Sequence, residues 1–150
     1  MDAVTYPNDE IVEFINNNVI PLRLASDAQP TAKNFNITWT PALLILDHNG
    51  IEHHRSIGFL EPVELMPSIL LGIGKVYYDK NEFQEAINYF EKIVVNYPES
   101  DSAPEAVFLI GVSRYKSMHN PQPLKEAYEA LQKNYSQSSW TKKAYPYRLL

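Results

Sequence analysis

The sequence predicts an α/β unit followed by an all-α region. In the first sixty residues, short apolar segments alternate with polar and proline-containing stretches, and one of them, Ala42–Leu46, precedes the turn residues Asn49 and Gly50. From residue 61 onward, apolar residues recur at helical spacing, and the pattern of residues 77–98 returns 38 positions later.

Composition limits the functions that the chain can have. The 150 residues are 45% hydrophobic and 12% aromatic, which is enough for one ordinary domain or two small ones. The net charge of -5, without a basic stripe, argues against nucleic acid and membrane surfaces as partners. Neither a long apolar span nor a signal peptide is recognisable, so we expect a cytoplasmic protein, or a periplasmic one if an upstream signal segment is missing.

The first helix and the first strand are predicted before residue 25. Asn8 can cap a helix whose apolar residues fall at helical spacing: Ile11, Phe14 and Ile15. This helix should end in the polar run of residues 16–18. Residues 19–24 then form an apolar run that predicts a strand, in which Pro21 indicates an edge or a bulge.

A short helix and a hairpin complete the α/β unit. The helix is expected over residues 28–35, although Pro30 makes it marginal or late-starting. Ala42–Leu46 is the clearest strand, Asn49 and Gly50 favour the positive φ angles of a tight turn, and residues 51–58 return as the second strand.

The most specific pattern of the chain lies in residues 70–98. Its members are Leu70, Ile73, Gly74, Tyr77, Ala86, Phe90 and Pro98. Their spacing matches the signature Trp-x₂-Leu-Gly-x₂-Tyr, Ala-x₃-Phe and Pro, with Leu and Ile in the first two places, so the segment resembles a tetratricopeptide repeat. The resemblance implies a helical hairpin that binds other proteins.

A second, weaker repeat follows. Tyr115 and Ser136 stand 38 positions after Tyr77 and Pro98, and Leu124 takes the place of Ala86. We therefore predict repeat units at residues 67–100 and 105–138, with a capping helix in residues 139–150.

The upstream half resembles the thioredoxin family. Trp39, Thr40 and Pro41 precede the apolar strand, at the place where that family carries a cis-proline, and the resemblance covers about residues 2–70. It implies that these three residues contact the backbone of a substrate. The family's first strand and its Cys-x-x-Cys motif are lacking, and the chain has no cysteine. Residues 1–66 are therefore predicted to be an incomplete thioredoxin-like unit, either truncated or degenerate.

One helix over residues 62–79 is expected to close the first unit and to open the array in residues 67–150. It would be about 27 Å long. Pro67 would kink this helix or divide it into two abutting helices.

In tetratricopeptide proteins the inner groove is lined by fixed positions of the first helix of each unit. Carried over, these are Ser68, Leu71, Lys75 and Tyr78 in the first unit and Ala106, Leu109, Ser113 and Lys116 in the second. We predict that Leu71, Tyr78 and Leu109 offer apolar contacts to a peptide and that the two lysines meet its acidic groups. The competing interpretation is that two repeats make no groove, and that these residues pack on the cap or on a second copy.

The leading functional hypothesis is a non-catalytic protein-protein interaction module, of a bacterial type of architecture. The alternative is a thiol-disulfide oxidoreductase whose dithiol lies upstream of this chain. No cofactor and no metal are expected, since His53 and His54 are neighbours on a strand and point to opposite faces. The missing first strand would expose a sheet edge, so a homo-oligomer formed through that edge is a further partner hypothesis.

Overall fold

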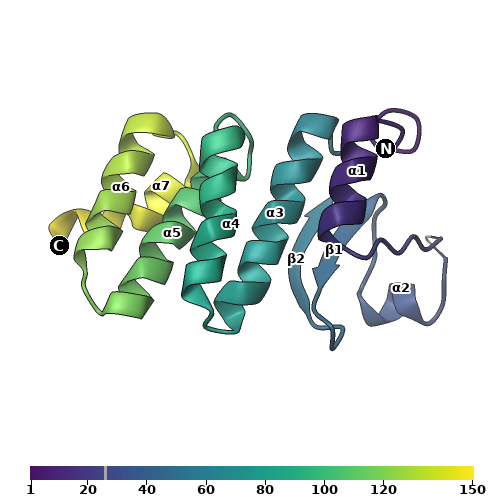
Figure 1. Cartoon of the computed structure of the whole chain (residues 1–150), viewed down its shortest axis with the longest axis horizontal. Coiled ribbons are helices and arrows are strands. Elements are labelled where there is room, and N and C mark those ends of the chain that lie inside the picture. Colours follow the sequence, from purple (N-terminus) through teal and green to yellow (C-terminus); the bar gives the residue numbers. More distant parts are fainter. Residues whose placement is uncertain (26) are drawn as a thin grey trace.

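A computed structural model describes residues 1–25 and 27–150 of the chain. The elements, in chain order, are α1 (Asp9–Asn18), α2 (Thr31–Asn34), β1 (Ala42–Leu46), β2 (Glu52–Ile57), α3 (Pro62–Asp79), α4 (Phe83–Asn96), α5 (Ala103–Met118), α6 (Gln122–Asn134), α7 (Ser139–Ala144) and the 3-10 helix η1 (Tyr145–Leu149). Figure 1 shows α3, α4, α5 and α6 in a row, with α7 against α5 and α6 and with the sheet and α1 at the N-terminal end of the row. The fold is a helical array that begins beside a small two-stranded sheet.

The first helix is confirmed together with its cap. The side-chain oxygen of Asn8 accepts hydrogen bonds from the backbone N–H groups of Glu10 and Ile11, at 3.0 and 3.3 Å. Ile11 is fully buried. The helix continues to Asn18, so the run of asparagines forms its last turn.

The strand expected over residues 19–24 is wrong. Residues 19–25 have no regular structure, and Ile20 and Leu22 are 96% and 80% exposed. A strand needs a neighbour for its backbone hydrogen bonds, and within the described chain β1 and β2 pair only with each other. Pro21 also lacks an N–H group to offer. Residues 19–25 therefore pair with no strand of the described chain, although one edge of β1 is open.

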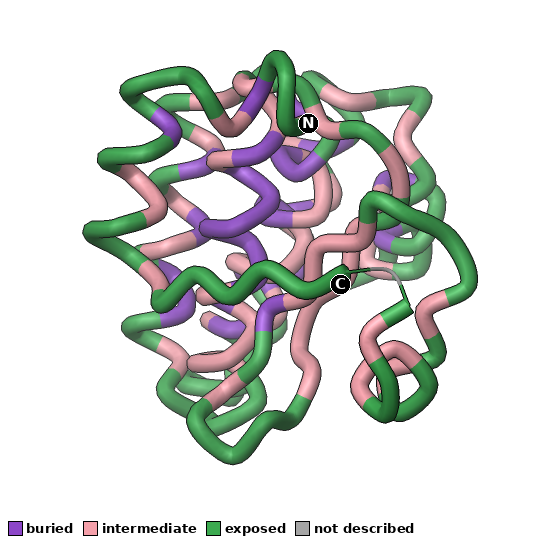
Figure 2. Tube along the Cα trace, turned by 90° about the vertical axis from the view of Figure 1, so that its right-hand side faces the viewer, coloured by how far each residue is buried: buried purple, intermediate pink, exposed green. Residues whose placement is uncertain are grey.

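The second helix starts late, as expected. It comprises only the four residues of α2, directly after Pro30. Figure 2 looks at the molecule from the end that carries α1 and the sheet, and none of the described residues in the loop with α2, 19–25 and 27–41, is buried. Proline fits the start of a helix because the first N–H groups have no partner within it.

Both strands of the hairpin are confirmed, but the turn between them is held in an unexpected way. Gly50 has a φ of 78°, whereas Asn49 is not among the residues with positive φ. The carboxylate of Asp47 accepts hydrogen bonds from the N–H groups of Asn49 and Ile51, both at 2.9 Å. The bond from Ile51 is the main reason why the pKa of Asp47 lies below its usual value. An aspartate closes this turn as much as the glycine does.

The expected junction helix is confirmed as one continuous element, α3. Pro67 lies inside it and is buried, without dividing it into two helices. Two glycines let neighbouring elements approach its backbone: a Cβ atom at Gly72 would overlap Ile45 of β1, and one at Gly74 would overlap the ring of Phe90 in α4. The sheet and the second helix of the array thus pack on two faces of α3.

The second helical hairpin, α5 with α6, is present with a corrected register. Gly111 plays the role of Gly74, since a Cβ atom there would overlap Ala127 of α6. Gly111 follows Gly74 by 37 positions, whereas the spacing of 38 holds at the helix ends, where Tyr97 and Tyr135 are the C-caps of α4 and α6. Between the glycine and the C-cap, the second hairpin therefore has one residue more than the first. The uniform register of 38 is wrong at Gly111 for this reason.

The chain ends in a short helix, as expected. α7 begins at Ser139, and the hydroxyl of Ser138 accepts a hydrogen bond from the N–H of Trp140 at 3.1 Å. The helix ends at Ala144, and Pro146 lies inside η1 rather than after the last helical turn. Both α7 and η1 pack against α6.

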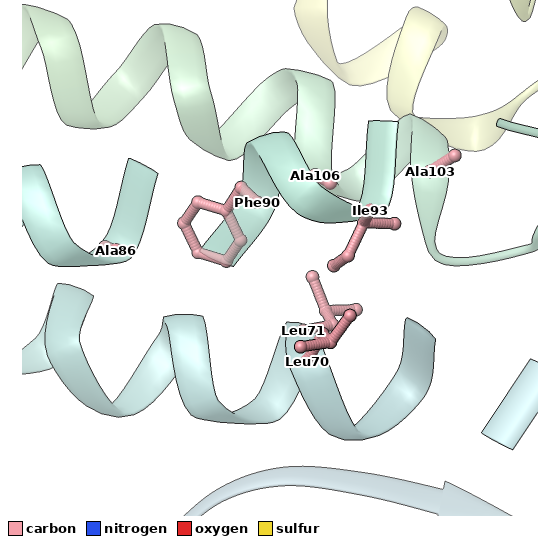
Figure 3. Close-up of a cluster of buried hydrophobic side chains, with 7 residues drawn as sticks. All are labelled: Leu70, Leu71, Ala86, Phe90, Ile93, Ala103 and Ala106. Atoms are coloured by element: carbon pink, nitrogen blue, oxygen red, sulfur yellow. The ribbon is translucent and has the colours of Figure 1, made fainter. Parts of the chain in front are cut away.

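Two buried clusters meet at α3. The first joins α3, α4 and α5, and its members, drawn in Figure 3, are Leu70, Leu71, Ala86, Phe90, Ile93, Ala103 and Ala106. The second joins α1, β1 and α3 through Ile11, Ile45, Leu65 and Ile69. Because α3 contributes to both clusters, the sheet and the helical array share one helix as a common wall.

In residues 1–66 the structure contains α1, α2, the two-stranded sheet and the start of α3. The peptide bond between Thr40 and Pro41 is cis. The assignment of this region as an incomplete thioredoxin-like unit stays a prediction, as do the domain boundaries.

Replacing Gly74 by alanine should destabilise the protein by roughly 1–3 kcal/mol, because the added methyl group would overlap the ring of Phe90. Urea unfolding followed by circular dichroism measures this loss. A second substitution, Phe90→Leu, made in the Gly74→Ala background, should cost less than it does in the wild-type protein, since a smaller side chain leaves room for the methyl group. An unchanged unfolding midpoint for Gly74→Ala would contradict the close packing of α3 and α4.

Candidate functional site

The neighbouring helices α3 and α5 bring together most of the residues that were predicted to line a groove. Two side-chain pairs cross between these helices: Lys75 forms an ion pair with Glu105, and Nζ of Lys116 lies 4.5 Å from the ring centre of Tyr78. Leu109 is half-buried against the first core cluster. We refer to Lys75, Tyr78, Glu105, Leu109 and Lys116 as the α3–α5 face.

Lys75 is occupied by groups of the protein itself. Besides its ion pair with Glu105, its Nζ lies 3.3 Å from Nδ1 of His54 in β2, and Nε2 of His54 lies 3.0 Å from the hydroxyl of Ser68 in α3. A lysine ammonium group only donates, so Nδ1 of His54 accepts and Nε2 carries the proton. The result is a polar chain, Glu105–Lys75–His54–Ser68, that runs from α5 through α3 to β2 and back to α3.

This polar chain requires a neutral histidine. Burial, followed by the charge of Lys75, lowers the pKa of His54 from 6.5 to about 4. At neutral pH the imidazole is therefore uncharged, and its Nδ1 lone pair can accept from Lys75.

Lys116 differs from Lys75 because it is exposed. Its ammonium group lies over two aromatic rings, 4.5 Å from the centre of Tyr78 and 5.7 Å from that of Phe83, and the two rings are in edge contact at 5.8 Å. Cation-π attraction holds the ammonium in place without using its N–H donors. Among residues 1–25 and 27–150, no carboxylate forms an ion pair with Lys116. Its ammonium group can therefore donate hydrogen bonds to a carboxylate of another molecule.

Other predicted groove positions lie in the interior. Leu71 is 2% exposed within the first core cluster, and Ser68 is covered by β2. Ala106 and Ser113 of α5 are fully buried. These four side chains present almost no surface to a partner.

The residues singled out by the thioredoxin resemblance lie elsewhere. Trp39, Thr40 and Pro41 are exposed on the segment that enters β1, and Trp39 is 69% exposed. They are not part of the α3–α5 face. Their contact with a substrate backbone stays a prediction.

The two adjacent histidines have different surroundings, as their positions on a strand indicate. His53 lies between two carboxylates, with Nδ1 hydrogen-bonded to Asp79 and Nε2 3.7 Å from Asp47, whereas His54 belongs to the polar chain. In the part of the chain that the structure describes, no group of three His, Asp or Glu side chains is placed to hold a metal ion. The helices described here are also too short or too polar to cross a membrane.

Comparison with known families gives the helical pair α3 and α4 an assignment. Residues 69–100 match the family model of the tetratricopeptide repeat. This match confirms a tetratricopeptide repeat at residues 69–100 and stops before α5, while the unit bounds 67–100 and 105–138 stay predictions. The hairpin of α5 and α6 lies beside the matched tetratricopeptide repeat and extends it into a helical array. Comparisons with curated proteins and with solved structures gave no match.

Acid should weaken the fold through His54. Its pKa is lower in the folded chain, about 4, than in the unfolded chain, about 6.5, so protons bind preferentially to the unfolded state. Stability should fall as the pH drops from 6.5 to 4, by up to roughly 2–3 kcal/mol. Urea unfolding at a series of pH values measures this slope.

Two variants isolate the contribution of His54. Glutamine at this position does not titrate, so His54→Gln should lose that part of the pH dependence. The control His119→Asn, at an exposed position where the backbone has a φ of 53°, should keep the slope of the wild-type protein. Equal slopes for His54→Gln and the wild-type protein would show that His54 is not held neutral by the fold.

Proposed function

We propose that the protein is a non-catalytic interaction module whose α3–α5 face binds a segment of a partner protein. The tetratricopeptide match over residues 69–100 supports protein binding as the role of the array. The observation that carries the choice of face is the exposed ammonium of Lys116 above the rings of Tyr78 and Phe83.

The chemistry of this face favours a segment that combines an acidic and an apolar residue. Lys116 offers unpaired donors to a carboxylate, and a hydrogen bond between two charged groups is stronger than one between neutral groups. Tyr78 and Leu109 supply half-buried apolar surface beside it. The neighbouring pair of Lys75 and Glu105 is neutral overall, so it adds no further attraction for charge.

The oxidoreductase hypothesis is less well supported. Thiol-disulfide exchange needs a thiolate, and none of the 150 residues is a cysteine. Its remaining argument is the thioredoxin resemblance around Thr40 and Pro41. The binding function requires only residues that this chain contains.

A random peptide library displayed on phage tests the proposed face. We expect selection on the immobilised protein to enrich peptides in which Asp or Glu stands close to Leu or Phe. The affinity of the selected peptides should fall about fivefold to tenfold for Lys116→Gln, which corresponds to a loss of about 1–1.4 kcal/mol. Fluorescence anisotropy with the labelled peptides measures the change.

Lys92 provides a matched control on another helix. Its Nζ lies 4.6 Å from the ring centre of Tyr89 in α4, which is nearly the same arrangement as that of Lys116 and Tyr78. Lys92→Gln should leave peptide affinity unchanged. Peptides that bind the wild-type protein and Lys116→Gln equally well would overturn the assignment of this face.

A further inference from the structure

The backbone pairing of the hairpin leaves one edge of β1 open. The N–H of Gly58 donates to the carbonyl of Pro41, and that of Asp47 donates to the carbonyl of Ile51. With Leu44 opposite Arg55, these bonds place Leu43 and Ile45 in the hydrogen-bonded pairs of the antiparallel ladder. The N–H and C=O groups of the alternate residues, Ala42, Leu44 and Leu46, therefore point away from β2.

These outward groups have no backbone partner among the described residues. Neither the loop bonds nor the β1–β2 ladder uses the N–H or the C=O of Leu44. An open strand edge of this kind is a template for another strand, because unpaired amide groups gain hydrogen bonds when a strand is added.

The side chains of β1 do not protect its edge. The strand reads Ala-Leu-Leu-Ile-Leu, without a charge, a proline or a glycine. In contrast, β2 carries Glu52 and Arg55, which are joined by an ion pair. Charged residues and prolines are the usual means by which an edge strand avoids pairing, and β1 has neither.

We propose that β1 pairs with β1 of a second copy of this chain, antiparallel and around a twofold axis. The product is a continuous four-stranded sheet with the order β2, β1, β1 and β2. A second copy is the favoured occupant because an uncharged strand placed against itself brings no like charges into opposition.

The open groups fix the register of this pairing. Leu44 lies opposite Leu44 of the partner subunit, and Ala42 lies opposite Leu46 of the partner subunit. All outward N–H and C=O groups of the two strands are then used, in about six hydrogen bonds. A shift by one residue would leave them unpaired.

Exposed apolar side chains lie near both ends of the hairpin. Ile57, which is opposite Ala42 in the hairpin, is 51% exposed, and Phe59 and Trp39 near the same end are 53% and 69% exposed. Leu46 at the other end of β1 is 38% exposed. Covering such apolar surface adds to the hydrogen bonds of the edge and favours association.

Sedimentation equilibrium with the wild-type protein and Leu44→Pro tests the proposal. Proline at this position removes an N–H that points outward, so it should spare the ladder between β1 and β2 while preventing the pairing of two copies. We expect a dimer for the wild-type protein and a monomer for the variant, with unchanged circular dichroism. A wild-type protein that stays monomeric at millimolar concentration, or a folded Leu44→Pro that stays dimeric, overturns the proposal.

A milder variant covers the case in which Leu44→Pro does not fold. Leu46→Lys places a charge at the exposed end of the edge and should raise the dimer dissociation constant at least about tenfold. Lys116→Gln, on the separate α3–α5 face, should dimerise as the wild-type protein does, so failure of the peptide-binding proposal is distinguishable from failure of this one. An unchanged dissociation constant for Leu46→Lys overturns the interface.

Introduced cysteines test the register, because the chain has none of its own. Ala42→Cys and Leu46→Cys are opposite each other in the proposed pair, with Cα atoms about 5.5 Å apart, which a disulfide can span. Oxidation of an equal mixture of the two variants should give the mixed disulfide dimer. Each variant alone should give little, because like positions lie about 13 Å apart along the strands. Cross-linking within the single variants but not between them overturns this register.

Discussion

The close approach of two neighbours to the backbone of α3 is the constraint on which the rest of the structure depends. Gly72 admits Ile45 of the sheet on one face, and Gly74 admits Phe90 of α4 on another. A side chain at either position would push one neighbour away by the width of a methyl group. Because α3 belongs to both core clusters, the position of the sheet, the packing of α4 and the direction of the array all follow from this one helix.

The polar contacts of α3 continue the same arrangement at the surface. Lys75 joins Glu105 of α5 to His54 of β2, so the helix is tied on its polar side to the same two regions that it contacts through its apolar sides. This arrangement separates the roles of two lysines that look alike in the sequence. Lys75 holds elements of the protein together, whereas Lys116 lies above aromatic rings and forms no ion pair with a carboxylate among the described residues.

Local patterns could be read from the sequence, and long-range pairings could not. The cap of α1 by Asn8 and the close approach of the first repeat's helices at Gly74 could be predicted. Each depends on residues within one helix or one hairpin. The ion pair of Lys75 and Glu105 depends on the relative position of two helices, and no local sequence motif predicts it. Residues 19–24 show the same limit, since an apolar run does not reveal whether a neighbouring strand exists. The role of Gly111 could have been predicted, but the assumption of a fixed spacing of 38 residues did not align it with Gly74.

The continuity of α3 also bears on how such a protein can change during evolution. Repeat proteins commonly gain and lose units by duplication, because each unit ends where the next begins. Here the predicted boundary at residue 66 lies inside α3, and Leu65 and Ile69, on either side of it, both belong to the cluster that packs toward the sheet. A recombination event at that point would leave each half with a bare apolar surface. The first repeat and the sheet are therefore expected to be inherited together.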